Sequence, residues 1–499
     1  MTEQGFQLLA IGLYFAAMLA IGYYAFRQTE DLDDYMLAGR SLKPGVAALS
    51  AGASDMSGWL LLGLPGAIYA AGLVEAWIAI GLTIGAWLNW RFVAPRLRSY
   101  TEVSNNSITV PSFLENRFKD KTRLLRVASG VIILAFFTFY VSSGIVAGGV
   151  FFEATFGAPY LVGMLLVAGI TLAYTLFGGF LGATLTDVAQ GLLMLAALIA
   201  VPLIALVSMG GWGEVAAGIG AADAAANAAG AEAELRRTSL LFGGTALGVV
   251  SAAAWGLGYF GQPHIIVRFM ALRSPADARA GRRIGISWMV ATALGAILTG
   301  LIGIAFIQSR GLTLDNPETV FLVLSQTLFH PFVAGLVLAA VLAAIMSTIS
   351  SQLIVCSSAL VEDLYNIFGR KLAPKKQVLL GRMGVLVVAL AAGLLALNPS
   401  GTILDLVGFA WAGFGAAFGP VILLSLFWRR MTAMGSLAGM VAGAVTVGIW
   451  GNVPALSDAM FEIVPGFIAC TVVAVLVSVA THRHSDEVHA EFAEMERRL

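Results

Sequence analysis

The chain of 499 residues is 59% hydrophobic, only 12% of its residues are charged, and its formal net charge at pH 7 is zero. Soluble domains carry roughly 25% charged residues, so this composition excludes a water-soluble protein and indicates a membrane protein along almost the whole chain. The neutral balance, with no basic tract outside the loops, also argues against a nucleic-acid partner.

Thirteen apolar runs are long enough to cross a bilayer, which takes about 20 helical residues. The first has no basic segment before it and no small-residue cleavage site, so we expect a retained span and not a signal peptide. In the ninth run we expect the helix to begin at Pro331. The runs lie near residues 6–26, 45–71, 74–95, 127–150, 160–180, 188–209, 240–262, 284–307, 322–349, 380–397, 401–427, 433–451 and 462–481.

The basic residues support this count and set an orientation. With the N-terminus outside, all but three of the 29 Lys and Arg residues, Arg268 among those inside, fall in loops on the inner side. Cytoplasmic loops are enriched in Lys and Arg, so we predict an outer N-terminus and an inner C-terminus. We expect one transmembrane domain over residues 1–482 and a short cytoplasmic tail over 483–499, either a polar helix or disordered.

Two loops between the spans are long. The inner segment 96–126 contains Thr-Val-Pro-Ser at Thr109–Ser112 followed by an amphipathic run, which favours a surface helix. The outer segment 210–239 is rich in Ala, Gly and Glu, and we expect weakly packed helix and coil there.

The second predicted span contains a carboxylate, Asp55, within Ala51–Leu60 (AGASDMSGWL). A carboxylate near the middle of a span costs roughly 2.5–3.5 kcal/mol, so it is rarely present without a partner. The neighbouring serines and glycines favour interruption of a helix over its continuation. We therefore expect a broken helix at Asp55, and a place where a cation or polar substrate binds.

The seventh predicted span contains a matching interruption at Trp255–Pro263 (WGLGYFGQP). Three glycines and a proline weaken the helix, and the freed backbone groups are tolerated at that depth only where they line a cavity or find partners. A kinked helix that packs through its glycines is the alternative. Trp255 and Tyr259 are spaced i, i+4, so a helix would place both rings on one face.

The two interruptions lie five spans apart, so five-helix units that start at them would enter the membrane from opposite sides. Paired interruptions of this kind indicate the midplane binding site of a secondary transporter. We expect a first repeat over about residues 45–209 (spans 2–6) and a second over about 240–427 (spans 7–11).

Ser347 and Thr348 are adjacent hydroxyls in the ninth span. Either they donate to carbonyls of their own helix, or they bind a small cation, because hard cations prefer oxygen ligands. Asp187 precedes the sixth span with no basic residue near it in the sequence. It either assists an ion on the inner side or caps that helix.

Several long strings resemble the solute:sodium symporter family, and the resemblance runs from about Asp33 to Phe467. They are LAGRSL (Leu37–Leu42), SDMSGWLLLGLPGA (Ser54–Ala67), WIAIGLTIGAWLNW (Trp77–Trp90), FFTFYVSSGIVAGG (Phe136–Gly149), TLFGGFLGATLTD (Thr175–Asp187), WGLGYFGQPHI (Trp255–Ile265), LAAIMSTISSQLIVCSSAL (Leu342–Leu360), YNIFGRK (Tyr365–Lys371) and AWAGFGAAFGPV (Ala410–Val421).

The resemblance implies an all-α polytopic protein with a leucine-transporter-type core of two inverted five-helix repeats. It implies a transporter, not an enzyme, that takes up L-proline together with Na⁺ across the bacterial cytoplasmic (inner) membrane, without an obligate protein partner. The remaining alternatives are a symporter of the same fold for pantothenate, a monocarboxylate or a sugar, and a membrane-embedded sensor. A sensor should carry a signalling domain after the last span, where only a short tail is present.

The resemblance also implies roles for individual residues. The Na⁺ site would consist of the backbone carbonyls of Ala53, Met56 and Ala344 and the hydroxyls of Ser347 and Thr348, with Asp55 involved in Na⁺ binding or coupling. Positions tied to proline binding are Ser57, Trp59, Tyr140, Trp255, Tyr259 and Pro263, to which we add Gln262 from the same interruption. Arg40 and Asp187 match positions that affect coupling from the cytoplasmic side.

Overall fold

The computed structural model describes residues 2–27, 38–230, 234–241, 245–365, 374–399 and 401–499. Leu37 and residues 366–371 of the family-like strings lie outside this part. All the described elements are helices, which confirms the all-α prediction for these residues, and Leu42 and Leu272 form one isolated bridge.

The first half of the chain contains α1 (Glu3–Phe26), η1 (Ala38–Arg40), α3 (Pro44–Asp55), η2 (Trp59–Gly63), α4 (Leu64–Ala71), η3 (Leu73–Glu75), α5 (Ala76–Leu88), η4 (Asn89–Val93), α6 (Ala94–Val103), α7 (Val110–Phe118), α8 (Leu124–Phe156), α9 (Tyr160–Ser208) and α10 (Trp212–Ala228).

The second half contains α11 (Ala246–Ala253), η5 (Ala254–Phe260), α12 (Pro263–Met270), α13 (Asp277–Ser309), η6 (Pro317–Thr319), α14 (Val320–Leu328), α15 (Pro331–Ser358), η7 (Ala359–Tyr365), α16 (Pro374–Leu395), α17 (Ile403–Phe427), α18 (Ala433–Gly451), α19 (Pro454–Ser457), α20 (Ile463–Thr481) and α21 (Asp486–Arg497). The helix of the ninth span begins at Pro331 as predicted, and residues 320–328 form a separate short helix.

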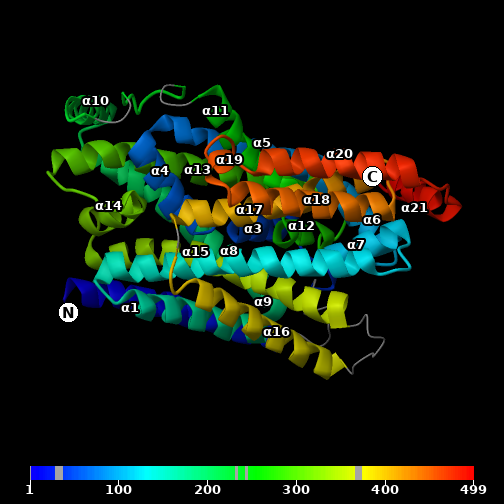
Figure 1. Cartoon of the computed structure of the whole chain (residues 1–499). Helices are drawn as coiled ribbons and strands as arrows, with labels where there is room; N and C mark the ends of the chain where they lie inside the picture. Colours follow the sequence, from blue (N-terminus) through cyan, green and yellow to red (C-terminus); the bar gives the residue numbers. More distant parts are fainter. Residues whose placement is uncertain (1, 28–37, 231–233, 242–244, 366–373, 400) are drawn as a thin grey trace.

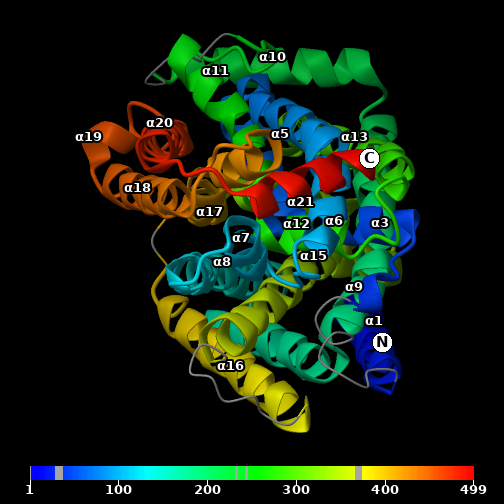
Figure 2. The same cartoon turned by 90° about the vertical axis from the view of Figure 1, so that its right-hand side faces the viewer.

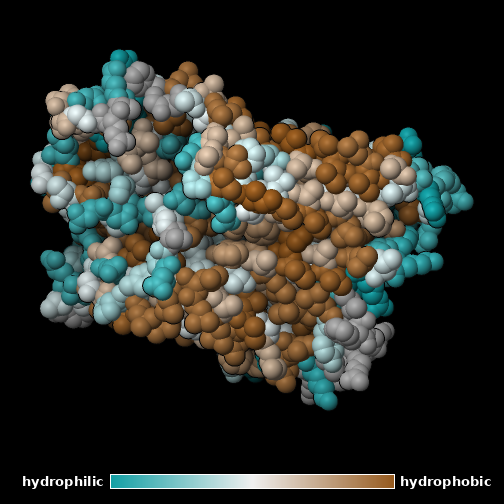
Figure 3. All heavy atoms as spheres, viewed as in Figure 1, coloured by the Kyte–Doolittle hydropathy of each residue, from teal (hydrophilic) through white to brown (hydrophobic). Residues whose placement is uncertain are grey.

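The helices form an elongated bundle with polar ends. Ten helices in the described part of the chain are long and apolar enough to span a membrane. Figure 3 shows a broad hydrophobic band around the middle of the bundle and hydrophilic side chains gathered at its two ends. The N-terminus lies at one end and the C-terminal helix α21 at the other (Figure 1). This surface belongs to a multi-pass membrane protein.

α9 consists of two helices that meet at Gly179, where φ is 57° and ψ is −156°. A residue with a side chain rarely adopts this positive φ, so glycine permits the sharp turn. The Tyr160 hydroxyl donates to the Ala396 carbonyl, and Met209 after the helix accepts from Ser309. Ala396 and Ser309 lie at the same end of the bundle, so the two halves of α9 run in opposite directions.

The two predicted interruptions are present. After α3 ends at Asp55, Met56 and Ser57 are not helical, and the chain resumes as η2 and α4. In the other, the 3₁₀ helix η5 replaces α-helix, and Gly261 and Gln262 separate it from α12. α3 contacts α9, α12, α13 and α15, so the inner halves of both broken helices lie in the core. Figure 2 shows α16 and the α18–α20 group at the edge of the bundle.

The segment after α9 forms the helix α10, which packs on the bundle through one face. α10 contacts α13 and buries Val215 and Ile219, and Gly218 lies against Ala305. Asp223 forms a buried ion pair with Arg237, 2.6 Å apart. The segment is thus helix followed by coil, as expected, and one face of α10 packs on α13 while most of its residues are exposed.

The tail forms an ordered helix, α21, at the end of the bundle opposite the N-terminus. Its Phe492 side chain is buried, and the Met495 carbonyl accepts from Ser99. Lys119, just after the predicted surface helix α7, lies 2.5 Å from Glu491 and 3.0 Å from Glu487. Burial opposes the charge of Lys119, but these two carboxylates outweigh it and raise its pKa. Of the two alternatives for the tail, the helix is therefore the one observed.

We expect Gly85→Ala to destabilise the fold. A Cβ on Gly85 would overlap the carbonyl oxygen of Gly256 in η5, and backbone cannot give way as a flexible side chain does. Overpacking of this kind costs about 1–3 kcal/mol, so thermal unfolding of the purified protein should begin at a lower temperature. Gly169→Ala is the matched control, because a Cβ there meets no atom within 4 Å. Equal unfolding temperatures for the two variants would contradict the close contact of α5 with η5.

Candidate functional site

The first interruption frees backbone carbonyls beside α15. The Ser347 hydroxyl donates to the carbonyl of Ala53 at 2.7 Å and lies 3.1 Å from the carbonyl of Ala344. The Thr348 hydroxyl lies 3.2 Å from the same Ala344 carbonyl. All of these residues are buried. Two carbonyl and two hydroxyl oxygens from α3 and α15 therefore meet at one point, which is a suitable set of ligands for a small hard cation.

Two further predicted residues belong to the same interruption. The Trp59 indole nitrogen donates to the Asp55 carbonyl at 3.1 Å, so Trp59 satisfies one of the freed backbone groups. Met56 is the first non-helical residue, with ψ of 75°. Its amide bonds to the Gly52 carbonyl at 2.9 Å.

The Asp55 carboxylate connects the two interruptions. It accepts a hydrogen bond from the Tyr259 hydroxyl of η5, and both side chains are buried. The Asn89 amide in turn donates to the Tyr259 carbonyl at 2.8 Å. The carboxylate is therefore directed at the second interruption, whereas Ser347 and Thr348 bond to carbonyls of α3 and α15.

Aromatic rings stack above Tyr259. The Tyr259 ring meets Trp411 edge-on at 5.2 Å, and Trp255 stacks on Trp411 at 6.5 Å and on Phe461 at 5.1 Å. The Trp411 indole nitrogen donates to the Trp255 carbonyl at 2.7 Å, and Gln262 donates to the Trp411 carbonyl at 3.0 Å. The predicted common face of an α-helix does not form here, because η5 is a 3₁₀ helix. Trp255 and Tyr259 instead both contact the ring of Trp411.

Several buried polar atoms at this level have no ordinary hydrogen bond. Tyr140 faces Ser57, yet neither hydroxyl has a partner of normal geometry within the described residues. The same holds for one carboxylate oxygen of Asp55, the Gln262 side-chain oxygen and both ring nitrogens of His264, which contacts Tyr140. Unpaired buried polar groups are costly, and a polar ligand that bonded to them would recover that cost. Pro263 begins α12 next to this group.

A vestibule of about 790 Å³ leads to the aromatic stack. Trp255 and Phe461 line it, together with the four carboxylic residues Glu75, Asp405, Asp458 and Glu462. An acidic entrance raises the local concentration of cations. Below the stack, the space beside Asp55, Met56 and Tyr259 measures only about 20 Å³, too small for an amino acid. This conformation is therefore open at the vestibule and closed at the level of Asp55.

Towards the other end of the bundle, a buried ion pair joins four helices. Arg268 of α12 lies 3.1 Å from Asp187 of α9 and 2.6 Å from the Ser351 hydroxyl of α15. Ser50 of α3 donates to Asp187 at 2.7 Å and accepts from Arg268 at 3.1 Å. Both charged side chains are at most 1% exposed. One half of each broken helix, α3 and α12, is thus tied to α9 and α15.

Arg40 lies nearer still to the end that carries α21. Its guanidinium donates to the Met270 carbonyl at 2.8 Å, to the Ser107 carbonyl at 2.6 Å, and to Asn106 at 3.0 Å. It therefore connects the entry to α3 with the end of α12 and the α6–α7 loop, away from Asp55.

Comparison with known proteins agrees with this arrangement. The sequence profile described as "Sodium:solute symporter family" matches residues 35–443, which is most of the chain. The chain belongs to this family.

The similar proteins of known name are transporters. The chain is 55% identical over 476 residues to the "High-affinity proline transporter PutP" of Bacillus subtilis, covering 95% of this chain and 98% of that one. It is 50% identical to the "Osmoregulated proline transporter OpuE" of the same organism, covering 99% and 98%. It is 48% identical to the "Sodium/proline symporter" of Staphylococcus aureus, covering 95% and 93%.

Solved structures share the fold. A Na⁺-coupled sialic acid symporter in a substrate-bound outward-open state superposes with a TM-score of 0.79 at 18% identity, covering 96% of this chain and 99% of that one. Mhp1, a nucleobase-cation-symport-1 family transporter, gives a TM-score of 0.55 at 14% identity, covering 92% and 97%.

Sequence reasoning about this symporter missed the arginine beside Asp187. Arg268 was expected in an inner loop, and this was wrong because it lies within α12. The N-cap alternative for Asp187 was also wrong, because the turn is at Gly179, eight residues earlier. A charged residue in the apolar segment PHIIVRFM could have indicated a buried partner. Trp411 and His264 were likewise not singled out.

We expect the Arg268–Asp187 pair to be energetically coupled. Asp187→Asn or Arg268→Gln alone should lower the free energy of unfolding by about 3–5 kcal/mol, because each leaves one buried charge without its partner. The double variant should cost clearly less than the sum of the two, measured by unfolding of the purified protein.

The matched control is the exposed pair Arg273–Asp277, 3.1 Å apart, whose coupling should stay below about 1 kcal/mol. Additive effects of Asp187→Asn and Arg268→Gln would show that the pair does not hold the four helices together.

Proposed function

We propose that this symporter takes up L-proline together with Na⁺ across the bacterial cytoplasmic membrane. The observation that carries the proposal is 48–55% identity over at least 95% of this chain to proteins named as proline transporters and sodium/proline symporters. These names disfavour the same-fold alternatives for pantothenate, a monocarboxylate or a sugar. They also disfavour a sensor, and they fit a protein that is not an enzyme.

We propose thirteen membrane crossings with the N-terminus outside and the C-terminus inside. Nine long apolar helices cross once each, the tenth, α9, would cross twice, and each of the two broken helices would cross once, which is consistent with that number. Termini at opposite ends of the bundle require an odd number of crossings (Figure 1). Spans 2–6 and 7–11 would form the two inverted repeats of a leucine-transporter-type core, over about 45–209 and 240–427, in one domain that ends near residue 482.

The proposed Na⁺ site consists of the carbonyls of Ala53, Met56 and Ala344 and the hydroxyls of Ser347 and Thr348. The contacts among four of these five residues support it. In the structure, each of the two hydroxyls donates a hydrogen bond to a backbone carbonyl. The hydroxyl oxygen and the carbonyl oxygen both carry lone pairs, so both could bind the same cation. The Asp55 carboxylate would supply nearby negative charge and hold the interruptions together through Tyr259, rather than bind the ion directly.

The proposed proline site lies between the interruptions, below Trp255. Ser57, Tyr140, Gln262 and the free oxygen of Asp55 are candidates to bond the charged ends of the amino acid. Tyr259 and the indole of Trp59 would supply apolar contact for its ring, and Pro263 would limit the cavity towards the inside.

Transport would proceed by alternating access. Na⁺ attracted by the acidic vestibule binds first and fixes α3 against α15, which orders the wall around Ser57. Proline enters when Trp255 moves aside, and the aromatic stack closes behind it. Release inward requires separation of the inner halves of α3 and α12 from α9, and Asp187 and Arg40 would control this step. Each Na⁺ that moves inward across a membrane potential of 100 mV would supply about 2.3 kcal/mol for the accumulation of proline.

The function is tested by uptake of labelled proline into proteoliposomes of the purified protein. We expect accumulation with an inward Na⁺ gradient and little with a K⁺ gradient of the same size. Excess unlabelled proline should abolish the signal, and pantothenate, lactate or glucose should not. Equal uptake in Na⁺ and K⁺ would refute Na⁺ coupling, and competition by another solute would refute proline as substrate.

A second prediction concerns the hydroxyl ligands. Ser347→Ala combined with Thr348→Ala should raise the Na⁺ concentration for half-maximal proline uptake at least about tenfold, since each lost ligand bond is worth about 1 kcal/mol. Ser358→Ala is the control on the same helix, because its hydroxyl bonds only to the Val355 carbonyl, 2.8 Å away. If the double variant has the Na⁺ dependence of the control, these hydroxyls do not bind the ion.

A further inference from the structure

A second large cavity lies at the end of the bundle that carries α21. It measures about 840 Å³ and lies between the η4–α6 junction, the start of α13 and the end of α17. Its lining includes none of the residues at the two interruptions, and Trp90 separates it from the small space beside Asp55 because that side chain lines both. In the topology proposed above, this is the cytoplasmic end.

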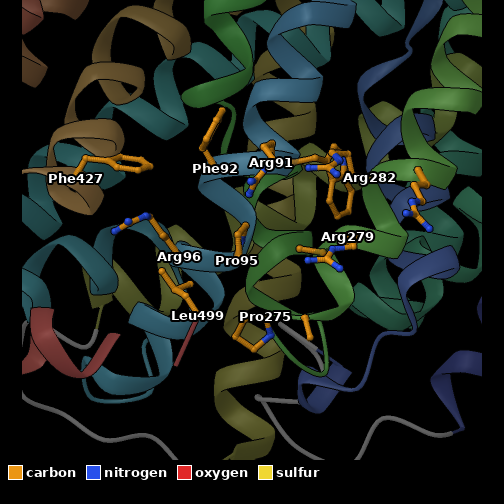
Figure 4. Close-up of a pocket in the computed structure, with 13 residues that line it drawn as sticks. Arg91, Phe92, Pro95, Arg96, Pro275, Arg279, Arg282, Phe427 and Leu499 are labelled. Carbon is orange, nitrogen blue, oxygen red and sulfur yellow. The ribbon is translucent and has the colours of Figure 1, made fainter. Parts of the chain in front are cut away.

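Five arginines from two parts of the chain line this cavity: Arg91, Arg96, Arg279, Arg282 and Arg283. Figure 4 shows Arg91 from one helix near Arg279 and Arg282 from another, and Arg96 directed towards Phe427. Among the described residues, only Arg96 of the five is within ion-pair distance of a carboxylate, 3.7 Å from Glu496. The cavity therefore concentrates the positive charges of four arginines that have no carboxylate of the described residues within ion-pair distance.

The aromatic side chains beside these arginines are exposed on the surface of the bundle. Trp87, Phe92 and Phe427 are 42–45% exposed, although each is large and apolar. The Arg282 guanidinium lies 5.5 Å from the Trp87 ring, Arg91 lies 5.2 Å from Phe92, and Arg96 lies 4.5 Å from Phe427. Aromatic rings paired with basic side chains are typical of the membrane–water interface.

The apolar surface continues from this cavity towards the middle of the bundle. Ile84 on α5 lies about one turn before Trp87, and Val290 on α13 lies about two turns after Arg283 on the same face of that helix. Both side chains are exposed. A ligand with a phosphate in the cavity and acyl chains over Ile84 and Val290 would contact both kinds of surface. A soluble phosphate compound would use only the arginines.

We propose that this cavity binds the headgroup of an anionic phospholipid from the cytoplasmic leaflet. Arg279 and Arg282 bond its phosphate, Arg91 approaches from the opposite wall, and Phe92 and Phe427 flank the acyl chains. Arginine suits this role because its planar guanidinium can donate two hydrogen bonds to one phosphate. Basic pockets between spans on the cytoplasmic side bind anionic headgroups by this chemistry. The lipid would connect the first repeat, through η4 and α6, to α13 of the second.

The test is binding of phosphatidylglycerol to the purified full-length protein in a neutral detergent. A fluorescent phosphatidylglycerol is titrated and its anisotropy measured, with the same phosphatidylcholine probe as reference. We expect the anionic lipid to bind at least tenfold more tightly. Arg279→Gln combined with Arg282→Gln should weaken its binding about tenfold to thirtyfold, since each basic residue contributes roughly 1 kcal/mol.

Arg430→Gln combined with Arg483→Gln is the matched control, because it removes the same charge from the same end outside the cavity. Arg91→Gln is a second test from the other wall, and gel filtration establishes that each variant is folded. Equal phosphatidylglycerol affinity of the cavity and control variants would overturn the site. If deacylated glycerophosphoglycerol binds as tightly as the lipid, the cavity serves soluble anions and the lipid proposal is overturned.

Discussion

The structure depends on one constraint, that two unwound segments in the middle of a membrane protein must find partners for their backbone carbonyls. Lipid offers none, so side chains from elsewhere supply them. Ser347 bonds to Ala53, Trp59 to Asp55, and Trp411 to Trp255. These contacts explain why α15 and α17 pack directly on the broken helices. They also leave oxygen atoms concentrated where a cation can bind.

The same segments are held differently towards the two ends of the bundle. Towards the vestibule, Trp255 rests on the rings of Trp411 and Phe461, which can slide or rotate at small cost because few directional bonds are broken. Towards the α21 end, Arg268 and Asp187 bind four helices through a network of charged hydrogen bonds. The open vestibule and the closed interior coincide with these two kinds of contact.

The sequence predicted both interruptions, the pair of hydroxyls beside them, and the span that begins at Pro331, because each has a local chemical signal. A carboxylate or a Gly-Pro cluster in an apolar run is expensive wherever it occurs, so its presence is informative without a structure. Arg268 and Trp411 could not be assigned in this way, because their partners lie 81 and 156 residues away in the sequence.

The pairing of Asp187 with Arg268 has an electrical consequence. Those two charges cancel, which leaves the Asp55 carboxylate as the formal charge at the interruptions. One bound Na⁺ would neutralise it, and zwitterionic proline adds no net charge. The loaded carrier would then reorient as an electrically silent species, and the empty carrier would return with a negative valence. Membrane voltage would therefore act mainly on the return step and on ion entry, and the turnover current would saturate with hyperpolarisation.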